Sequence, residues 1–241
     1  MKKPVVDYRS LRLSNLNTPE FSHLKLLLGW VVYFALYILT ENLNPPEKCH
    51  SIHIPLDDRI PFHEGFAFFY VGWYALIVIS LLYFLFYNVE NFRRLQTYFI
   101  IVQTLAMLVY IVYPSRQDLR PEVFPRENLL TAMMAFLYRI DTPTGVCPSL
   151  HVAMSLGIAS TWLREKQAKR WGRGVIALFC LGVCASVAFV KQHSVADIFA
   201  AIPLCLIAEW FVFFRKRSVE NYSDDPDTCV NTPVAFKKRK C

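Results

Sequence analysis

The stretch that decides the fold is "GFAFFYVGWYALIVISLLYFLFY", residues 65–87, which contains no charged side chain. An α-helix rises about 1.5 Å per residue, so a helix of this length crosses the roughly 30 Å hydrocarbon core of a membrane. Its apolar residues form one continuous block and do not alternate with polar ones as in a soluble core. The stretch therefore predicts a membrane-spanning helix.

Five further apolar blocks have the same character: Leu24–Thr40, Leu95–Tyr113, Ser149–Leu163, Val175–Val190 and Val195–Phe214. The chain of 241 residues is 54% hydrophobic and 15% aromatic, which leaves too little polar sequence to cover a water-soluble globule. We predict an all-α integral membrane bundle of six helices within residues 24–217. Residues 1–23 then form a cytoplasmic N-terminal segment, residues 218–241 a disordered cytoplasmic tail, and "ENLLTAMMAFLYRI" (127–140) a short helix along the membrane surface.

Basic residues concentrate in alternate connections of this predicted bundle. Eighteen lysines and arginines lie in the N-terminal segment, in the second and fourth connections and after Phe214, whereas seven lie in the other three connections. Because basic residues next to membrane helices face the cytoplasm, we expect a protein of the cell membrane with both termini inside. The net charge of +7 then suits anionic lipid headgroups at the inner face, and no stretch resembles a nucleic-acid site.

The seven cysteines do not have the arrangement of a disulfide-rich domain. Cys49 and Cys147 share the predicted outer side, where a disulfide between them is an open alternative. The sequence has no CxxC or HExxH pattern that would predict a metal cage. We therefore expect neither a metal nor another cofactor.

Unusual polar residues lie on the predicted outer side of the membrane. Polar groups close to the hydrocarbon are expensive and commonly functional. A helix cap, or a side chain that reaches toward the headgroups, is the simpler explanation for any single one of them. Three connections far apart in the sequence nevertheless place such residues on the same face, so we expect one extracytoplasmic site made of Arg116, Arg120, Ser149, His151, Lys191, His193 and Asp197.

Four of these residues suit the binding of a phosphate group. Arginine and lysine bind phosphate oxygens, and arginine does so with two parallel hydrogen bonds. A serine at the start of a helix adds its hydroxyl to the free backbone N–H groups there. The phosphate-binding candidates are Arg120, Ser149, Lys191 and Arg116.

The remaining three residues suit acid–base and nucleophilic chemistry. His193 and Asp197 are four residues apart, so on a helix they share a face and the carboxylate can hold one ring N–H. The other ring nitrogen is then a candidate nucleophile, and His151 is the candidate general acid. A zinc site formed by two histidines and an aspartate is the rival interpretation, although three nearby cations would repel the metal.

The stretches "SRQDLRP" (115–121), "PSLH" (148–151) and "SVAFVKQHSVAD" (186–197) resemble the three signature motifs of the type 2 phosphatidic acid phosphatase (PAP2) superfamily. Those motifs read Lys-x6-Arg-Pro, Pro-Ser-Gly-His and Ser-Arg-x5-His-x3-Asp. The resemblance covers roughly residues 65–215 and implies a six-helix bundle without a metal. It also implies a phosphohistidine on His193, with His151 as the acid, Asp197 as the residue that orients His193, and Arg120 and Ser149 as phosphate ligands.

The chain departs from these motifs at three positions. Tyr113 stands where the first motif has lysine, Leu150 where the second has glycine, and Val187 where the third has arginine. Our hypothesis is that Arg116 and Lys191 supply the two missing positive charges from shifted positions. Similar departures occur in the branch that includes inositol-phosphorylceramide and sphingomyelin synthases, which transfer a phospho-headgroup.

We expect a membrane lipid phosphatase that hydrolyses a phosphomonoester or diphosphate at an outward-facing site. Phosphatidic acid, a phosphatidylglycerol phosphate and a polyprenyl diphosphate all fit this expectation. The alternative is a phospholipid headgroup phosphotransferase that uses the same residues. A transporter with Asp197 and Glu209 as ion-coupling groups is a further alternative, but the sequence has no inverted repeat. The expected partners are the lipid phosphate and the bilayer, and the oligomeric state is open.

Overall fold

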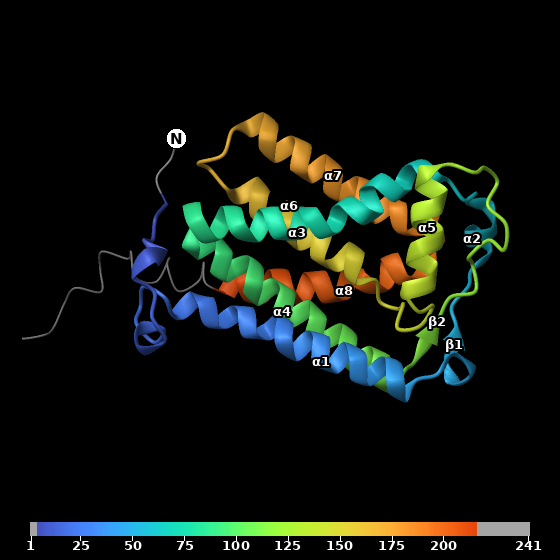
Figure 1. Cartoon of the computed structure of the whole chain (residues 1–241), viewed down its shortest axis with the longest axis horizontal. Coiled ribbons are helices and arrows are strands. Elements are labelled where there is room, and N and C mark those ends of the chain that lie inside the picture. The colour runs from blue at the N-terminus through green and yellow to red at the C-terminus, as the bar shows by residue number, and fades with distance from the viewer. Residues whose placement is uncertain (1–3, 216–241) are drawn as a thin grey trace, which may run out of the picture.

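The structure is a computed structural model that describes residues 4–215, and its long helices run side by side in one bundle (Figure 1). The bundle is formed by α1 (Leu28–Leu43), α3 (Ala67–Tyr87), α4 (Val89–Val112), α6 (Leu150–Arg164), α7 (Arg170–Phe189) and α8 (Val195–Glu209), which continues as the π-helical turn Trp210–Phe214. Short 3-10 turns cover Tyr8–Ser10, Leu13–Asn15, Ser22–Leu27, Pro46–Lys48 and Glu64–Phe66. The prediction of a mainly helical chain is confirmed.

Five helical segments in the described part of the chain are long and apolar enough to cross a membrane. They are Ser22–Leu43, Glu64–Tyr87, Val89–Val112, Arg170–Phe189 and Val195–Phe214. The chain therefore has the helices of a multi-pass membrane protein. The sixth predicted span coincides with α6, whose 15 residues cover only about 22 Å, so six spans remain a prediction.

Helix α6 lies inside the bundle, where it packs against α4, α7 and α8. Its contact with α4 is so close that a Cβ atom on Gly157 would lie 2.4 Å from the Tyr98 ring. The indole N–H of Trp162 donates to the Ser80 hydroxyl of α3 at 3.0 Å. Because α6 is surrounded by other helices, its N-cap Ser149 is buried and His151 in its first turn is half-buried at one end of the bundle.

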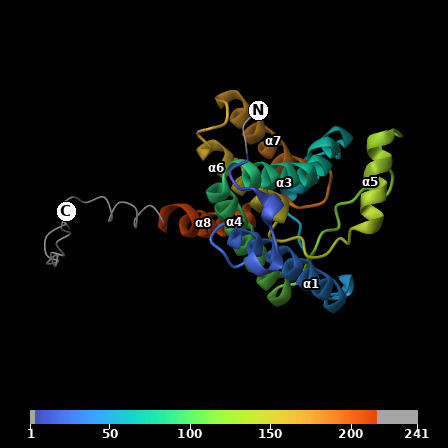
Figure 2. The same cartoon turned by 60° about the vertical axis from the view of Figure 1, so that its left-hand side comes forward.

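The same end of the bundle carries the shorter elements α2 (Pro55–Arg59), α5 (Leu129–Ile140), β1 (His50–Ser51) and β2 (Ser115–Arg116) (Figure 1). Figure 2 shows α5 standing beside the long helices, across their ends, and not within the bundle. This short helix was predicted from residues 127–140. The all-α prediction did not include β1 and β2, which pair in parallel with His50 opposite Ser115.

The N-terminal segment lies at the opposite end and is folded onto the bundle (Figure 1). The Tyr8 hydroxyl donates to the main-chain oxygen of Leu85 at 2.9 Å and lies 2.8 Å from Nε2 of His23, which is fully buried. Burial raises the pKa of Tyr8 to about 12. The predicted disordered tail, residues 218–241, lies outside the described residues.

Cys49 and Cys147 are free thiols, so the alternative of a disulfide between them is wrong for this structure. The Cys49 thiol lies 3.6 Å from the main-chain oxygens of Asn44 and Pro45, in the turn that follows α1. Burial, together with the nearby carboxylate of Asp197, raises the pKa of Cys147 to about 12. Each thiol thus faces its own polar surroundings and not the other thiol.

Candidate active site

His193 lies in the turn that enters α8, and two acceptors hold its ring. Nδ1 of His193 lies 2.9 Å from the main-chain oxygen of Val146 and 3.2 Å from Oδ2 of Asp197. The same Oδ2 atom accepts the backbone N–H of Ser194 at 3.1 Å. The Asp197 carboxylate therefore caps the first turn of α8 and orients the imidazole at the same time.

These contacts determine the tautomer of the His193 ring. A carbonyl oxygen only accepts hydrogen bonds, so Nδ1 carries the proton and donates it. In the neutral ring, Nε2 then keeps its lone pair, as a nucleophilic nitrogen must. The i, i+4 spacing predicted the Asp197 contact, but the shorter contact, to Val146, comes from a residue 47 positions away.

His151 faces His193 from the first turn of α6. The two ring centroids are 5.7 Å apart, so a phosphoryl group bound at the His193 ring would lie within reach of the His151 ring. On its other side the His151 ring packs against Tyr70, with centroids 4.4 Å apart, and against Trp73, at 4.1 Å. Nε2 of His151 is buried and has no hydrogen-bond partner among the described residues, which leaves it available to a bound group.

Both histidines open into a cavity of about 680 Å³ that lies between α1 and α3. Its walls are mainly apolar and aromatic, with Trp30, Tyr33 and Tyr37 on α1 and Tyr70, Trp73 and Tyr74 on α3. The volume falls within the range of about 300–1,000 Å³ that is typical of sites for small organic ligands.

The cavity reaches the lateral surface of the bundle. Phe34 on α1 and Tyr74 and Val78 on α3 line the cavity and are also 54%, 50% and 54% exposed, respectively. An opening between two apolar helices suits entry by a lipid chain, because the chain would stay in contact with apolar side chains.

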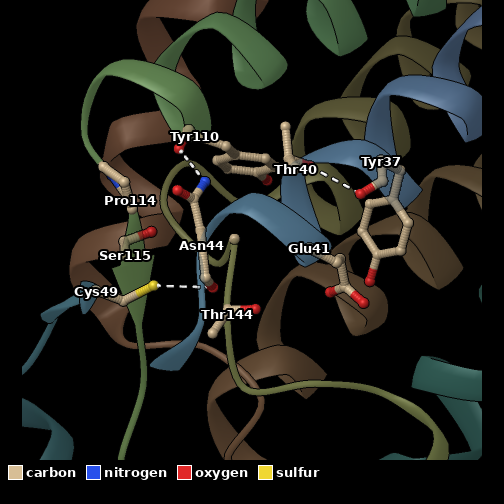
Figure 3. Close-up of a pocket in the computed structure, with 10 residues that line it drawn as sticks. Tyr37, Thr40, Glu41, Asn44, Cys49, Tyr110, Pro114, Ser115 and Thr144 are labelled. Carbon is tan, nitrogen blue, oxygen red and sulfur yellow. Dashed lines mark hydrogen bonds between the residues drawn. The ribbon is translucent and has the colours of Figure 1, made fainter. Parts of the chain in front are cut away.

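A second, water-sized hollow of about 10 Å³ lies beside this cavity and shares Tyr37, Tyr110, Thr144 and Gly145 with it (Figure 3). Asn44 Nδ2 donates to the main-chain oxygen of Tyr110 at 3.2 Å, and the Thr40 hydroxyl donates to that of Tyr37 at 2.8 Å. The Asn44 contact ties the end of α1 to α4 and so positions the α1 wall of the cavity, whereas the Thr40 contact lies within α1.

Arg120 lies near the histidines, but its guanidinium is already fully bonded. It donates to Gln192 Oε1 at 2.7 and 3.1 Å and to the main-chain oxygens of Tyr138, Asp141 and Thr142 at 2.9–3.3 Å. A cation at the last carbonyls of a helix complements its dipole, so Arg120 fastens the end of α5 to the residue that precedes His193. Arg120 does not line the cavity.

The structure does not bring Lys191 and Arg116 to the histidine pair. Lys191 adopts a left-handed conformation (φ 53°) where α7 ends, a common way to terminate a helix. The Lys191 ammonium group donates to the main-chain oxygen of Asp57 at 2.8 Å, and both residues line a separate surface pocket. Arg116 donates to the main-chain oxygen of Pro46 and pairs with Asp118.

Ser149 is fully buried as the N-cap of α6 and does not line the cavity. Its hydroxyl accepts the backbone N–H of Val152 at 3.5 Å, and its own N–H donates to the main-chain oxygen of Asp197 at 3.1 Å. Ser149 therefore joins the start of α6, whose first turn carries His151, to the first turn of α8, which follows His193.

Asp57 was not among the predicted site residues. Its carboxylate bonds the two residues that directly follow His193. Its carboxylate is 2% exposed and accepts the Ser194 hydroxyl at 2.6 Å and the Val195 N–H at 2.8 Å. No local signal in "IPLDDR" (54–59) points to α8, because these partners lie 137 and 138 residues away.

Asp141 was also missed, although it lines the cavity. Its carboxylate accepts Gln192 Nε2 at 3.3 Å and the Tyr37 hydroxyl at 3.5 Å. Burial raises the pKa of Asp141, and the positive charge of Arg120 opposes that shift. An acidic residue directly after the last turn of a helix is unfavourable for the dipole, and this was the signal available in the sequence.

The rival interpretations find less support in this geometry. No group of three His, Cys, Asp or Glu side chains in residues 4–215 is arranged to hold a metal ion. Glu209, the second ion-coupling candidate of the transporter alternative, bonds Ser160 and Arg164 near the far end of α8.

No protein-family model, curated protein or solved structure matches the chain. Its membership of a family therefore remains the prediction made by its three motifs.

Proposed function

We propose that the protein catalyses metal-independent phosphoryl transfer from a membrane lipid to water, through a phosphohistidine on His193. The observation that carries this proposal is the His193 ring, whose Nδ1 is held by Val146 and Asp197 and whose centroid lies 5.7 Å from that of His151 at the wall of the cavity. A buried histidine with one oriented N–H and a second histidine opposite it has the parts of a nucleophile and its acid.

In the first step, the Nε2 lone pair of His193 attacks the phosphorus and the bond to the leaving oxygen breaks. His151 gives a proton to that oxygen, and the negative charge of the bound phosphate favours the protonated ring that this transfer needs. In the second step, neutral His151 takes a proton from a water molecule that attacks the phosphohistidine, which restores both rings. Asp197 stabilises the positive charge that develops on His193, as the carboxylate of a Ser–His–Asp triad does for its histidine.

The lipid nature of the substrate is supported by the aromatic and aliphatic lining of the cavity and by its exposed edge at Phe34, Tyr74 and Val78. We place the site on the extracytoplasmic side, as the distribution of lysine and arginine predicts.

A second candidate, transfer of the phosphoryl group to a lipid hydroxyl, is favoured by one observation. No lysine or arginine of the described residues lines the cavity. A phosphodiester carries one negative charge and a phosphomonoester up to two, so the diester needs fewer positive groups. Water and a hydroxyl group would attack the same phosphohistidine.

The test is the trapping of the covalent intermediate. Purified full-length protein in detergent with EDTA is mixed with lipids labelled on the phosphorus, and acid-labile label on the protein is counted. We expect label on the wild type and on His53→Ala, a control histidine that pairs with Asp58 outside the cavity. His193→Ala should carry none, and His151→Ala should form the intermediate more slowly. Label on His193→Ala at the wild-type level would refute the assignment.

A further inference from the structure

The charges that line the histidine cavity are unusual for a phosphate site. Among the described residues of its wall, Asp141 is the one side chain other than the two histidines that can carry a charge, and it is an acid. A phosphate oxygen next to a carboxylate is repelled unless a positive group lies between them. The positive group nearest in the hydrogen-bond network, Arg120, is engaged behind the wall by main-chain oxygens and Gln192.

The walls around Asp141 are suited to a positive group. The α1 wall presents Tyr33 and Tyr37, with ring centroids 6.1 Å apart, and the α3 wall presents Trp73 and Tyr74, 5.0 Å apart. Tryptophan and tyrosine faces attract ammonium groups, and a cluster of such rings binds quaternary ammonium ligands. The Tyr37 hydroxyl joins this wall to the carboxylate, at 3.5 Å from Asp141 Oδ1.

The carboxylate also lies close to the reacting histidines. Asp141 Oδ2 is 3.3 Å from the amide nitrogen of Gln192, the residue that directly precedes His193. A ligand with a positive group a few bonds from its phosphorus would therefore reach the carboxylate while its phosphate lies between His193 and His151.

We propose that Asp141 and the surrounding tryptophan and tyrosine rings bind the ammonium group of a zwitterionic lipid whose phosphate lies against the two histidines. The proposal rests on the proposed function only for the position of the phosphate. The ammonium group supplies the positive charge that the wall of the cavity lacks. Two kinds of lipid have this chemistry: phosphodiesters with an amino-alcohol headgroup, and phosphomonoesters of an amino-alcohol chain.

The experiment measures binding, so that it does not depend on turnover. Purified full-length protein in maltoside micelles is titrated with short-chain lipids while tryptophan fluorescence is recorded, because Trp30 and Trp73 line the cavity. The probes are the dihexanoyl forms of phosphatidylcholine, phosphatidylethanolamine and phosphatidylglycerol, with a short-chain sphingoid base phosphate and dihexanoyl phosphatidic acid as the monoester pair. Phosphatidylglycerol has the same chains and phosphodiester as the first two lipids but no ammonium group.

We expect at least one amine-bearing probe to bind at least tenfold more tightly than its amine-free partner. The pair that shows this difference tells whether the ammonium group belongs to the headgroup of a phosphodiester or to the chain of a phosphomonoester. Asp141→Asn should remove the preference and Asp141→Glu should restore part of it. Glu122→Gln, an exposed carboxylate of the same connection that does not line the cavity, should keep it. Folding of each variant is checked by its thermal unfolding and its elution as a single species.

Equal affinities within both pairs for the wild type, or an undiminished preference in folded Asp141→Asn, would overturn the proposal. A preference for amine-bearing lipids in a protein that never forms a phosphoenzyme would support this binding site and refute the phosphohistidine chemistry. Formation of a phosphoenzyme together with equal affinities would support the phosphohistidine chemistry and refute the ammonium-binding site. Failure of the binding site and failure of the proposed function are therefore distinguishable.

Discussion

The contact between Asp57 and the start of α8 gives a prediction that tests how the catalytic turn is held. The Asp57 carboxylate accepts the Ser194 hydroxyl, the Val195 N–H and the Ile54 N–H at 2.6, 2.8 and 2.9 Å. The Asp57 side chain is 2% exposed. A hydrogen bond to a buried charged group contributes about 1.5–3 kcal/mol.

We expect Asp57→Ala to lower the free energy of unfolding by about 3–5 kcal/mol, because two donors at the start of α8 lose their partner. Asp57→Asn retains one acceptor oxygen and should lose about 1–3 kcal/mol. Denaturant titration of the protein in detergent gives these differences. Asp58→Asn is the matched control, since its carboxylate is 68% exposed and bonds His53 outside the cavity.

The same substitution should also slow the chemistry while the protein remains folded. The turn held by Asp57 carries His193 and Asp197, whereas the cavity walls do not include Asp57. We therefore expect Asp57→Asn to form the phosphoenzyme at least about tenfold more slowly, a change of about 1.4 kcal/mol, with little change in KM. Asp57→Glu should recover part of the rate. Stabilities and rates of Asp57→Asn that match those of Asp58→Asn would refute the reasoning.

Two further predictions concern Asp141 and the orientation in the membrane. Burial raises the pKa of Asp141 above 3.8, so the folded state binds its proton more tightly than the unfolded state, and wild-type stability falls as the pH rises through the folded-state pKa. The Tm of Asp141→Asn relative to wild type should accordingly increase as the pH rises from below the unfolded-state pKa through the folded-state pKa, and a difference that does not change with pH would contradict the shift. A membrane-impermeant thiol reagent applied to intact cells should label Glu122→Cys but not Lys166→Cys, both exposed in the structure, and the reverse pattern would place the site on the cytoplasmic side.

The sequence by itself determined the features that depend on neighbouring residues. The charge-free block of residues 65–87 predicts a long helix because length and composition are local properties, and α3 covers Ala67–Tyr87. The contact between His193 and Asp197 was predicted from their spacing of four residues, and it forms although His193 lies in the turn before α8 and not in the helix itself.

Only the tertiary structure decided where the charged side chains go. Lys191 is two residues from His193, yet its left-handed backbone turns the ammonium group toward Asp57, so nearness in the sequence did not place it in the cavity. Arg120 satisfies the carbonyl oxygens at the end of α5, a helix that follows it in the chain. A charged side chain forms hydrogen bonds with the polar groups that still lack a partner after the helices have packed. Which groups lack a partner depends on contacts between segments far apart in the sequence.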